Sequence, residues 1–299
     1  MTGSDASVDP VVDSIELSVV IPAFNAAATI GEQLEALTAQ GWAGEWEVVV
    51  ADNGSTDETA KIVKQFALVN PRIRLIDAGT VSGASFARNH GVEASRGTSI
   101  AFCDADDVVS DSWVRSMGEA LREHAFVTGP QEFESLNPEW LWGIYGSRPA
   151  KELQIFEGIF AFGPGANLGV RRGDFESAGG FDCSMHTGED IDVCLRLWLK
   201  GIKLVFVPDA VVHYRYRQDV GSLWRQAVSY GETAPAIAKS LADAGREHPS
   251  SWSGAKRWIW LARRLPSLRT PSGRARWIVV AGTSLGRVVG SVRNRRVVL

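Results

Sequence analysis

Cysteine is scarce in this sequence. The chain has three cysteines in 299 residues, Cys103, Cys183 and Cys194, which lie far apart and form no CxxC pair. An odd number at this spacing favours neither a disulfide framework nor a zinc cluster, so we expect a reducing, cytosolic setting. Residues 1–14 lack the basic start and apolar stretch typical of a signal peptide, so export is not expected.

Long hydrophobic runs and glycine-rich phosphate loops are also missing. The longest apolar stretch, near "WIVVAGTSLG", is shorter than the ~20 residues that span a bilayer. After its first apolar run the chain reads "PAFNAA". A nicotinamide-dependent oxidoreductase would have GxGxxG there, and a sugar nucleotidyltransferase would have a Gly-rich loop, so both classes are disfavoured.

Acidic residues are absent from residues 249–299, where eleven basic residues occur. Of the 31 basic residues in the chain, 20 remain elsewhere, against 35 acidic ones. A body with a charge of about −15 therefore precedes an extension of +11, and we expect the two parts to face different partners.

Apolar runs rich in β-branched residues recur along the chain, at 17–21, 47–51, 73–76, 99–103, 125–129 and 203–207. Segments with helical spacing separate several of them, at 28–39, 57–67, 84–95 and 112–123. This alternation indicates βαβ units and an α/β fold, with a Rossmann-like, mainly parallel sheet flanked by helices. Residues 130–165 are turn-rich and aromatic, and resemble a loop region that either covers the core or grips a substrate.

Three carboxylates crowd the end of one apolar run, in "AFCDADD". Like charges this close raise one another's pKa, so either a cation lies among them or they are well solvated. Mg²⁺ is usually held by one or two carboxylates plus substrate phosphates, which makes Asp104 and Asp106 a suitable half-site. The alternative is a solvated acidic turn before the helix expected from Ser112, and we assign Asp107 to that turn.

Four further features are ambiguous when taken one at a time. Pro22 is expected to stop the first strand, and Asp52 follows another strand, at the edge where ligands of such sheets bind. Glu189 and Asp190 open a helix in "GEDIDVCLRLWLKG", a pattern that capping alone explains. His213 is either a metal ligand or a surface histidine.

The order of the motifs is more specific than any one of them. "SVVIPAFN", "VVVADNGSTD", "GASFARNHGVEASRGTSIAFCDADD", "GANLGVRRGDFESAGGFD" and "GEDIDVCLRLWLKG" occur in succession over about residues 16–215. This series resembles the family 2 glycosyltransferases of the GT-A fold. The resemblance implies transfer of a sugar from a nucleotide-sugar donor to an acceptor hydroxyl with inversion, with Mg²⁺ or Mn²⁺ as cofactor.

The resemblance also implies roles for single residues, which stay expectations here. Pro22, Phe24 and Asn25 would form part of the nucleotide pocket, and Asp52 would accept a hydrogen bond from the nucleobase. Arg88 would help to hold the nucleotide, and Asp104 would lie near the ribose and the metal. The metal would be ligated by Asp106 and by His213. Asp190 would be the general base, in the catalytic pair that it forms with Glu189.

We expect a loose tail at 1–14, a glycosyltransferase domain at 15–248 and a basic, Trp-rich and Arg-rich extension at 249–299. The Gln-x-x-Arg-Trp motif of processive synthases is missing, so a single addition in cell-envelope or other glycan or glycolipid synthesis is favoured. The rival hypothesis is a glycan-binding or scaffold protein with the same fold and no turnover.

The extension at 252–299 suggests peripheral contact with an anionic membrane, where lipid-linked acceptors lie. A solvated tail, or one docked on the acidic body, is the alternative, and no nucleic-acid-binding fold accompanies the charge. The enzyme is thus expected in the cytoplasm, at the inner face of the membrane if the extension binds there.

Overall fold

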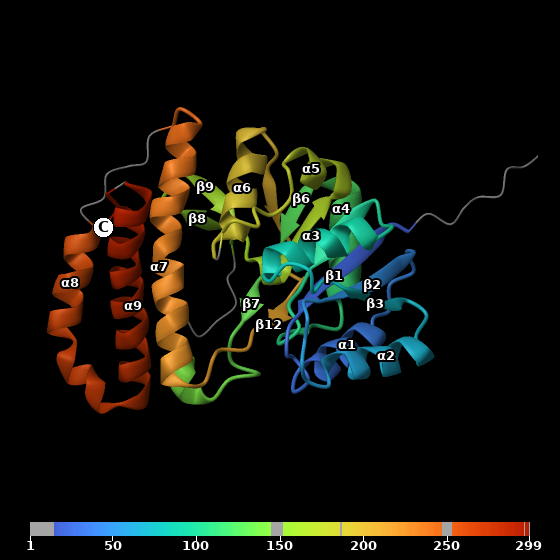
Figure 1. Cartoon of the computed structure of the whole chain (residues 1–299), viewed down its shortest axis with the longest axis horizontal. Coiled ribbons are helices and arrows are strands. Elements are labelled where there is room, and N and C mark those ends of the chain that lie inside the picture. Colours follow the sequence, from blue (N-terminus) through green and yellow to red (C-terminus); the bar gives the residue numbers. More distant parts are fainter. Residues whose placement is uncertain (1–14, 145–151, 186, 247–252, 296, 299) are drawn as a thin grey trace, which may run out of the picture.

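The computed structural model describes residues 15–144, 152–185, 187–246, 253–295 and 297–298. Its centre is a seven-stranded sheet (Figure 1). In spatial order the strands are β11 (Leu204–Phe206), β6 (Phe126–Thr128), β10 (Leu168–Arg171), β4 (Ser99–Phe102), β1 (Leu17–Ala23), β2 (Trp46–Asp52) and β3 (Ile73–Asp77). All neighbours are parallel except β10, which runs antiparallel to both β4 and β6. The predicted mainly parallel α/β sheet is confirmed.

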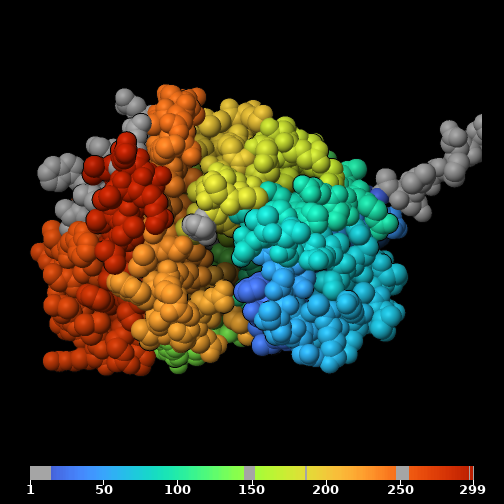
Figure 2. Space-filling view, in the orientation of Figure 1, coloured from blue at the N-terminus to red at the C-terminus, as the bar shows by residue number. Residues whose placement is uncertain are grey.

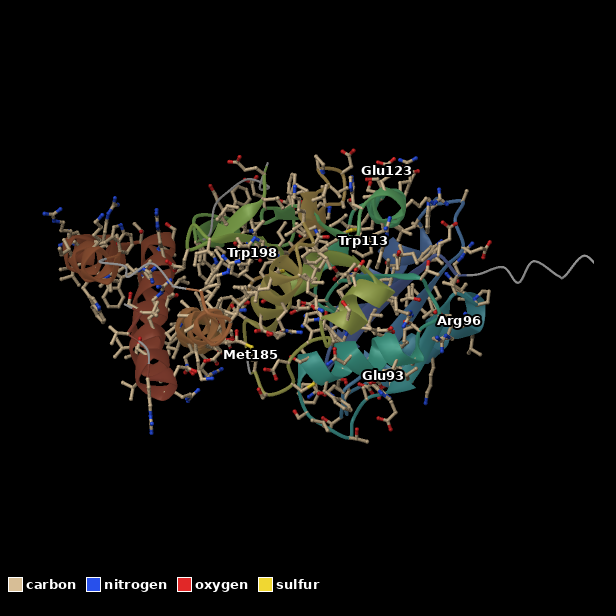
Figure 3. The ribbon with its side chains drawn as sticks, turned by 90° about the horizontal axis from the view of Figure 1, so that it is seen from above. Glu93, Arg96, Trp113, Glu123, Met185 and Trp198 are labelled. Carbon is tan, nitrogen blue, oxygen red and sulfur yellow. The ribbon has the colours of Figure 1, made fainter. Side chains whose placement is uncertain are left out.

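Helices cover both faces of this sheet because side chains alternate along each strand. Leu17, Val19 and Ile21 of β1 pack with one set of helices. This set comprises α1 (Ile30–Thr38), α2 (Thr59–Val69) and α4 (Trp113–Glu123). Val20 packs on the other face, with α3 (Ala84–Ala94), α5 (Arg172–Ser177) and α6 (Glu189–Leu199). Figure 3 shows α4 with Glu123 on one side of the sheet and α3 with Glu93 on the other.

Two small sheets occupy the segments around the main one. One contains β5 (Val108–Val109), β12 (Val212–His213) and β7 (Gln131–Glu132), and the other contains β8 (Gln154–Phe156) and β9 (Phe160–Phe162). The short 3₁₀ helices are η1 (Glu139–Leu141), η2 (Gly165–Asn167) and η3 (Leu265–Arg269). Trp140 packs against a buried cluster around Leu141, which supports the core-covering interpretation of that ring. Tyr145, another aromatic residue of the segment 130–165, lies outside the described residues.

The C-terminal part consists of α7 (Val220–Asp243), α8 (Ser253–Arg263) and α9 (Pro271–Asn294). Helices α7 and α9 lie side by side, with α8 beyond α9 (Figure 1). The approach is close: a Cβ on Gly286 would lie 1.9 Å from the backbone oxygen of Val228. Ion pairs join Arg287 to Glu157 and Arg293 to Glu232. The expected boundary at residue 248 lies between α7 and α8 in the sequence, and α9, on its far side, packs against α7.

Candidate active site

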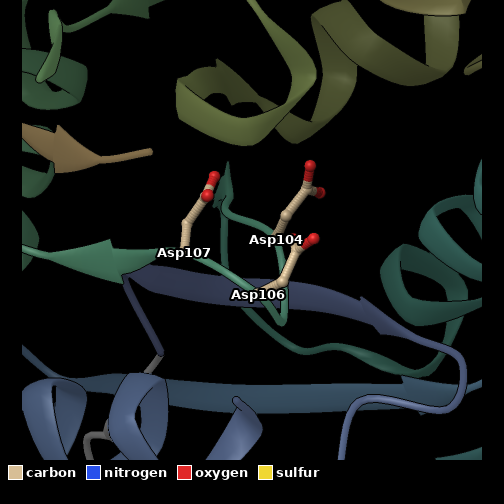
Figure 4. Close-up of side chains that lie close together, drawn as sticks. All are labelled: Asp104, Asp106 and Asp107. Carbon is tan, nitrogen blue, oxygen red and sulfur yellow. The ribbon is translucent and has the colours of Figure 1, made fainter. Parts of the chain in front are cut away.

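The acidic loop follows β4 at the carboxyl end of the parallel strands. Asp104, Asp106 and Asp107 each offer a carboxylate oxygen within 4.8 Å of the others (Figure 4). Strand β4 lies between β1 and β10 in the sheet and ends at Phe102. The loop that follows it therefore lies at the sheet edge where ligands of such folds bind. The use of Asp104 and Asp106 as a half-site for a metal stays a prediction.

Asp107 is fully buried, so its assignment to a solvated turn was wrong. Its Oδ1 accepts a hydrogen bond of 2.8 Å from the backbone N–H of Arg215, just beyond β12. Its Oδ2 has no hydrogen-bond partner among the described residues. Pairing of β12 with β5 holds this distant segment over the loop, which a local sequence pattern does not reveal.

The carboxylates of the site, with Glu189 and Asp190 included, outnumber the three arginines beside them, Arg88, Arg215 and Arg217. Burial, and then the charge of Asp104, raises the pKa of Asp106, although Arg217 stands 3.8 Å away. Burial and the two neighbouring carboxylates raise the pKa of Asp107 well above its ordinary value. Carboxylate oxygens are the ligands that Mg²⁺ and Mn²⁺ prefer. The unpartnered Oδ2 of Asp107 and the excess charge both fit a divalent cation.

Arg88 joins the acidic loop to the start of α6. Its side chain is 5% exposed, and its terminal nitrogens donate to Asp104 Oδ1 at 2.7 Å and to Glu189 Oε1 at 2.8 Å. Burial lowers the pKa of Arg88, but the charges of Asp104 and Glu189 outweigh it and the pKa is raised. Both ends of the guanidinium are thus directed at carboxylates, whereas the sequence placed this residue at the nucleotide.

Asp190 lies in the first turn of α6, beside Glu189. Its Oδ2 accepts from the backbone N–H of Gly165 at 3.0 Å, and its Oδ1 accepts from that of Ile191 at 2.8 Å. Burial, and then the charge of Glu189, raises the pKa of Asp190 to about 6, against the opposing effects of the Gly165 hydrogen bond and of Arg88. A carboxylate with this pKa is a stronger base than an ordinary aspartate and is still ionised at neutral pH.

Gly188 sets the turn that presents this pair. Its φ is +78°, a left-handed conformation that favours glycine. A Cβ at this position would lie 2.2 Å from Cγ2 of Thr233, which belongs to α7. The start of α6 therefore rests directly on the C-terminal helices.

The loops after β1 and β2 lie next to each other, because Ala23 pairs with Asp52 in the sheet. Pro22 lies within β1, which continues to Ala23, so the expectation that Pro22 stops the strand was wrong: in a parallel strand it removes one N–H donor only. Phe24 is 61% exposed. Asn25 has a φ of +48° and accepts through Oδ1 from the N–H of Thr56 at 2.8 Å.

Asp52 also takes part in the turn that follows β2. Its Oδ1 accepts from the N–H of Ser55 at 3.1 Å. Ser55 in turn accepts through Oγ from the N–H of Asn25 at 2.9 Å. The structure thus brings together the two loops that the sequence assigned to the nucleotide.

His213 lies on β12, with its Nδ1 2.7 Å from Oε2 of Glu132. Neither ring nitrogen of His213 belongs to the group of ligand atoms within 4.8 Å. Arg215, two residues on, reaches that loop instead: its Nε donates to the backbone oxygen of Asp106 at 2.9 Å. Arg215 was not among the residues predicted for the site, although the alternation in "HYRYR" places His213, Arg215 and Arg217 on one side of an extended segment.

Figure 2 shows a hollow on the face of the molecule nearest the viewer. Its borders have the blue and cyan of β1 and α3 on one side and the yellow and orange of α6 and α7 on the other. These are the segments that supply or support the aspartates, Arg88 and the α6 turn, so the hollow lies beside the candidate site.

A mainly parallel sheet with an acidic loop and an acidic helix start at its ligand-binding edge is the arrangement that the motifs predicted for the GT-A fold. The model of Glycosyl transferase family 2 matches residues 18–178, and that of Glycosyl transferase family group 2 matches residues 99–280. The chain belongs to glycosyl transferase family 2, as its motifs predicted.

Individual relatives are named as glycosyltransferases. The chain is 30% identical over 200 residues to Glycosyltransferase AglE of Haloferax volcanii, covering 65% of each chain. It is 26% identical over 288 residues to the Pre-mycofactocin glycosyltransferase of Mycobacterium tuberculosis, covering 93% of this chain and 58% of the relative. The match thus spans less than two thirds of the length of either relative.

Solved structures of glycosyltransferases share the fold. The mannosyltransferase PcManGT from Pyrobaculum calidifontis, in complex with GDP-Man and Mn²⁺, matches with a TM-score of 0.62 and 18% identity over 92% of this chain and 86% of that one. S. aureus TarS in complex with UDP-GlcNAc matches with a TM-score of 0.57 and 17% identity over 94% and 93%. The fold is therefore the predicted GT-A fold.

Proposed function

We propose that this protein is an inverting glycosyltransferase that moves one sugar from a nucleotide-sugar donor to an acceptor hydroxyl. The observation that carries the proposal is that one arginine joins two clusters of carboxylates, which lie in different environments. The loop with Asp104 and Asp106 lies at the edge of the sheet, and Arg88 joins it to the turn of Glu189 and Asp190. The proposed metal-binding residues and the proposed general base are thereby held at a fixed distance from each other. This suits a reaction in which the acceptor displaces the diphosphate in one step.

Asp106 is the proposed metal ligand, with Asp104 near the ribose and the metal, and Asp107 adds an oxygen within 4.8 Å of both. A bound Mg²⁺ or Mn²⁺ would neutralise the charge that develops on the departing nucleoside diphosphate. His213 remains a proposed additional ligand. Its Nδ1 contact with Glu132 resembles the carboxylate–histidine pairs that orient metal-ligating imidazoles, which leaves Nε2 for the metal.

Asp190 is the proposed general base. In an inverting displacement the acceptor hydroxyl attacks the anomeric carbon as the bond to the diphosphate breaks, and its proton passes to a carboxylate oxygen of Asp190. The raised pKa suits this role, because it strengthens the base without protonating it at pH 7. Glu189 contributes by fixing Arg88 and by raising the pKa of its neighbour.

Pro22, Phe24, Asn25 and Asp52 are proposed to hold the nucleotide. The exposed ring of Phe24 offers a stacking surface for a base, and the linked loops after β1 and β2 fix its position. Relatives of the fold are described with UDP-GlcNAc and GDP-Man, so uridine and guanosine diphosphate sugars are the first donors to test.

The acceptor is proposed to be a glycan or a lipid-linked glycan, in the cytoplasm. One assay distinguishes a transferase from a non-catalytic glycan-binding protein. It measures the release of nucleoside diphosphate from UDP-, GDP- and dTDP-sugars with Mn²⁺, with and without chelator. A transferase releases diphosphate in the presence of metal and a suitable sugar acceptor. A protein that binds a donor without any release under these conditions is a binding protein.

Two variants assign the roles. Asp190→Asn should retain donor binding, measured by calorimetry, and lose about 10²–10⁴ in turnover, because only the proton acceptor is removed. Asp106→Ala should lose both, because the metal also holds the donor. An Asp190→Asn protein with normal turnover contradicts the assignment of the base, and tight Mn²⁺-dependent donor binding by Asp106→Ala contradicts that of the ligand.

A further inference from the structure

Helix α9 carries an exposed apolar stripe in its second half, made of Leu285, Val288, Val289 and Val292. These side chains are 40%, 36%, 37% and 76% exposed. Their spacing of three, one and three residues places them on one side of the helix. We call these four residues the α9 stripe.

The stripe is exposed because the other sides of α9 are in use. Gly282, Gly286 and Gly290 face α7, where a Cβ on Gly282 would lie 2.7 Å from that of Ala227. Helix α8 reaches α9 near Trp277, whose Nε1 donates to the backbone oxygen of Leu261 at 3.1 Å. The α9 stripe begins two turns beyond Trp277, so neither helix covers it.

The two helices at the C-terminal end, α8 and α9, are rich in basic residues. Residues 249–299 contain no acidic residue. Arg287 and Arg293 are paired with acidic residues of other segments. Seven further cations are exposed and make no ion pair within the described part of the chain, namely Lys256, Arg263, Arg264, Arg269, Arg274, Arg276 and Arg295. We call these seven residues the basic set.

Part of the basic set shares the side of the stripe. Arg274 precedes Leu285 by about three helical turns, which returns it to the same side of α9. On α8, Trp258 and Ile259 are 49% and 51% exposed within a segment that also bears Lys256 and Arg263. Exposed apolar side chains thus alternate with cations over both helices.

We propose that the α9 stripe and the basic set form a docking surface for an anionic lipid bilayer, on which the C-terminal helices lie flat. Apolar side chains that enter the boundary between headgroups and acyl chains, with cations at the phosphates beside them, are the two contributions that hold interfacial helices. Within the described residues, no helix has the length and hydropathy to cross a membrane. The contact is therefore peripheral.

Charge also selects between a bilayer and a second copy of this chain. Two copies that met through their α9 stripes would each bring helices that bear the basic set, and like charges oppose association. An anionic surface neutralises the same cations. Each Lys or Arg that engages an anionic leaflet contributes about a fivefold gain in binding.

The test uses the full chain, because removal of α8 and α9 would uncover the face of α7 that packs on α9. Sedimentation with vesicles of phosphatidylcholine alone and of phosphatidylcholine mixed with phosphatidylglycerol measures binding, at low and at high salt. We expect binding to the mixed vesicles only, and we expect salt to weaken it because salt screens exposed charges.

Two sets of variants locate the surface. Val289→Asp/Val292→Asp should abolish vesicle binding, whereas the matched control Leu68→Asp/Val69→Asp, at exposed apolar positions of α2, should retain it. Arg263→Gln/Arg264→Gln/Arg269→Gln should weaken binding about 100-fold if all three cations engage. The control Lys64→Gln/Arg115→Gln/Lys203→Gln has the same change in net charge at exposed positions and should leave binding unchanged.

Several outcomes overturn the proposal. One is a wild-type protein that fails to bind mixed vesicles. Another is equal loss of binding in the test and control sets, because overall charge would then be the cause. A third is a wild-type dimer in gel filtration that Val289→Asp/Val292→Asp converts to a monomer, since the stripe would then be a self-interface. Transferase activity enters none of these measurements, so they stand apart from the proposed function.

Discussion

Replacement of Arg88 by glutamine tests the charge network that joins the two halves of the site. The Arg88 side chain is 5% exposed and holds Asp104 and Glu189 at 2.7 and 2.8 Å. Removal of one partner from a buried ion pair typically costs about 3–5 kcal/mol, because an uncompensated charge is left behind. We expect Arg88→Gln to lower the free energy of unfolding by about this amount, a large share of the ~5–15 kcal/mol typical of a protein domain.

Urea denaturation followed by tryptophan fluorescence measures this loss. Arg122→Gln is the matched control, because Arg122 also pairs with a carboxylate, that of Glu16, but is exposed, and exposed pairs add little stability. A double variant, Arg88→Gln/Glu189→Gln, should lose less than the sum of the two single variants, because removing both partners leaves one buried charge fewer. The reasoning is refuted if Arg88→Gln unfolds at the same urea concentration as the wild type.

The same substitution has a second effect that a purely structural role would not produce. The charge of Arg88 lowers the pKa of Asp190, so its removal should raise that pKa further. The acidic limb of the rate profile should then move to higher pH in any Arg88→Gln protein that remains folded. An unchanged limb would show that Arg88 does not act on the proposed base.

Two further predictions concern the base and the C-terminal helices. Turnover of the wild type should fall as the pH drops through about 6, because Asp190 must be ionised to act as a base and its pKa is about 6. A pH–rate profile of nucleotide release without this fall would contradict the assignment of Asp190. Gly286→Ala should destabilise the protein by about 1–3 kcal/mol in thermal unfolding, because its Cβ would lie 1.9 Å from the backbone oxygen of Val228. The control Gly173→Ala, which has open space around the new Cβ, should not destabilise it. Equal melting temperatures of the two variants would contradict the close packing of α7 and α9.

The sequence predicted most of the central sheet because six of its strands are runs of β-branched and apolar residues, covered on both faces. It missed β10, whose four residues Leu168–Arg171 include a glycine and an arginine and run antiparallel between β4 and β6. Nothing in such a short segment distinguishes a strand from a loop. Its neighbours in the sheet, distant in sequence, supply the pairing that makes it one.

The candidate site shows the same limit. The strand ends placed Asp52 and Asp104 at the ligand edge, because a strand end is a local feature, whereas the role of Asp190 came only from the family resemblance. The burial of Asp107 depends on the N–H of Arg215, and the position of Arg88 depends on Glu189, each about one hundred residues away. Contacts between such distant segments are set by packing, so no pattern within either segment could have predicted them.

The contact between Gly188 and Thr233 limits how this protein can be recombined with its relatives. Gly188 begins the turn that presents Asp190, and Thr233 belongs to α7, which in turn packs on α9. A chimera that exchanged the last three helices for those of another family member would need a side chain no larger than threonine opposite residue 188. The C-terminal helices can therefore be exchanged only for a sequence that preserves this fit.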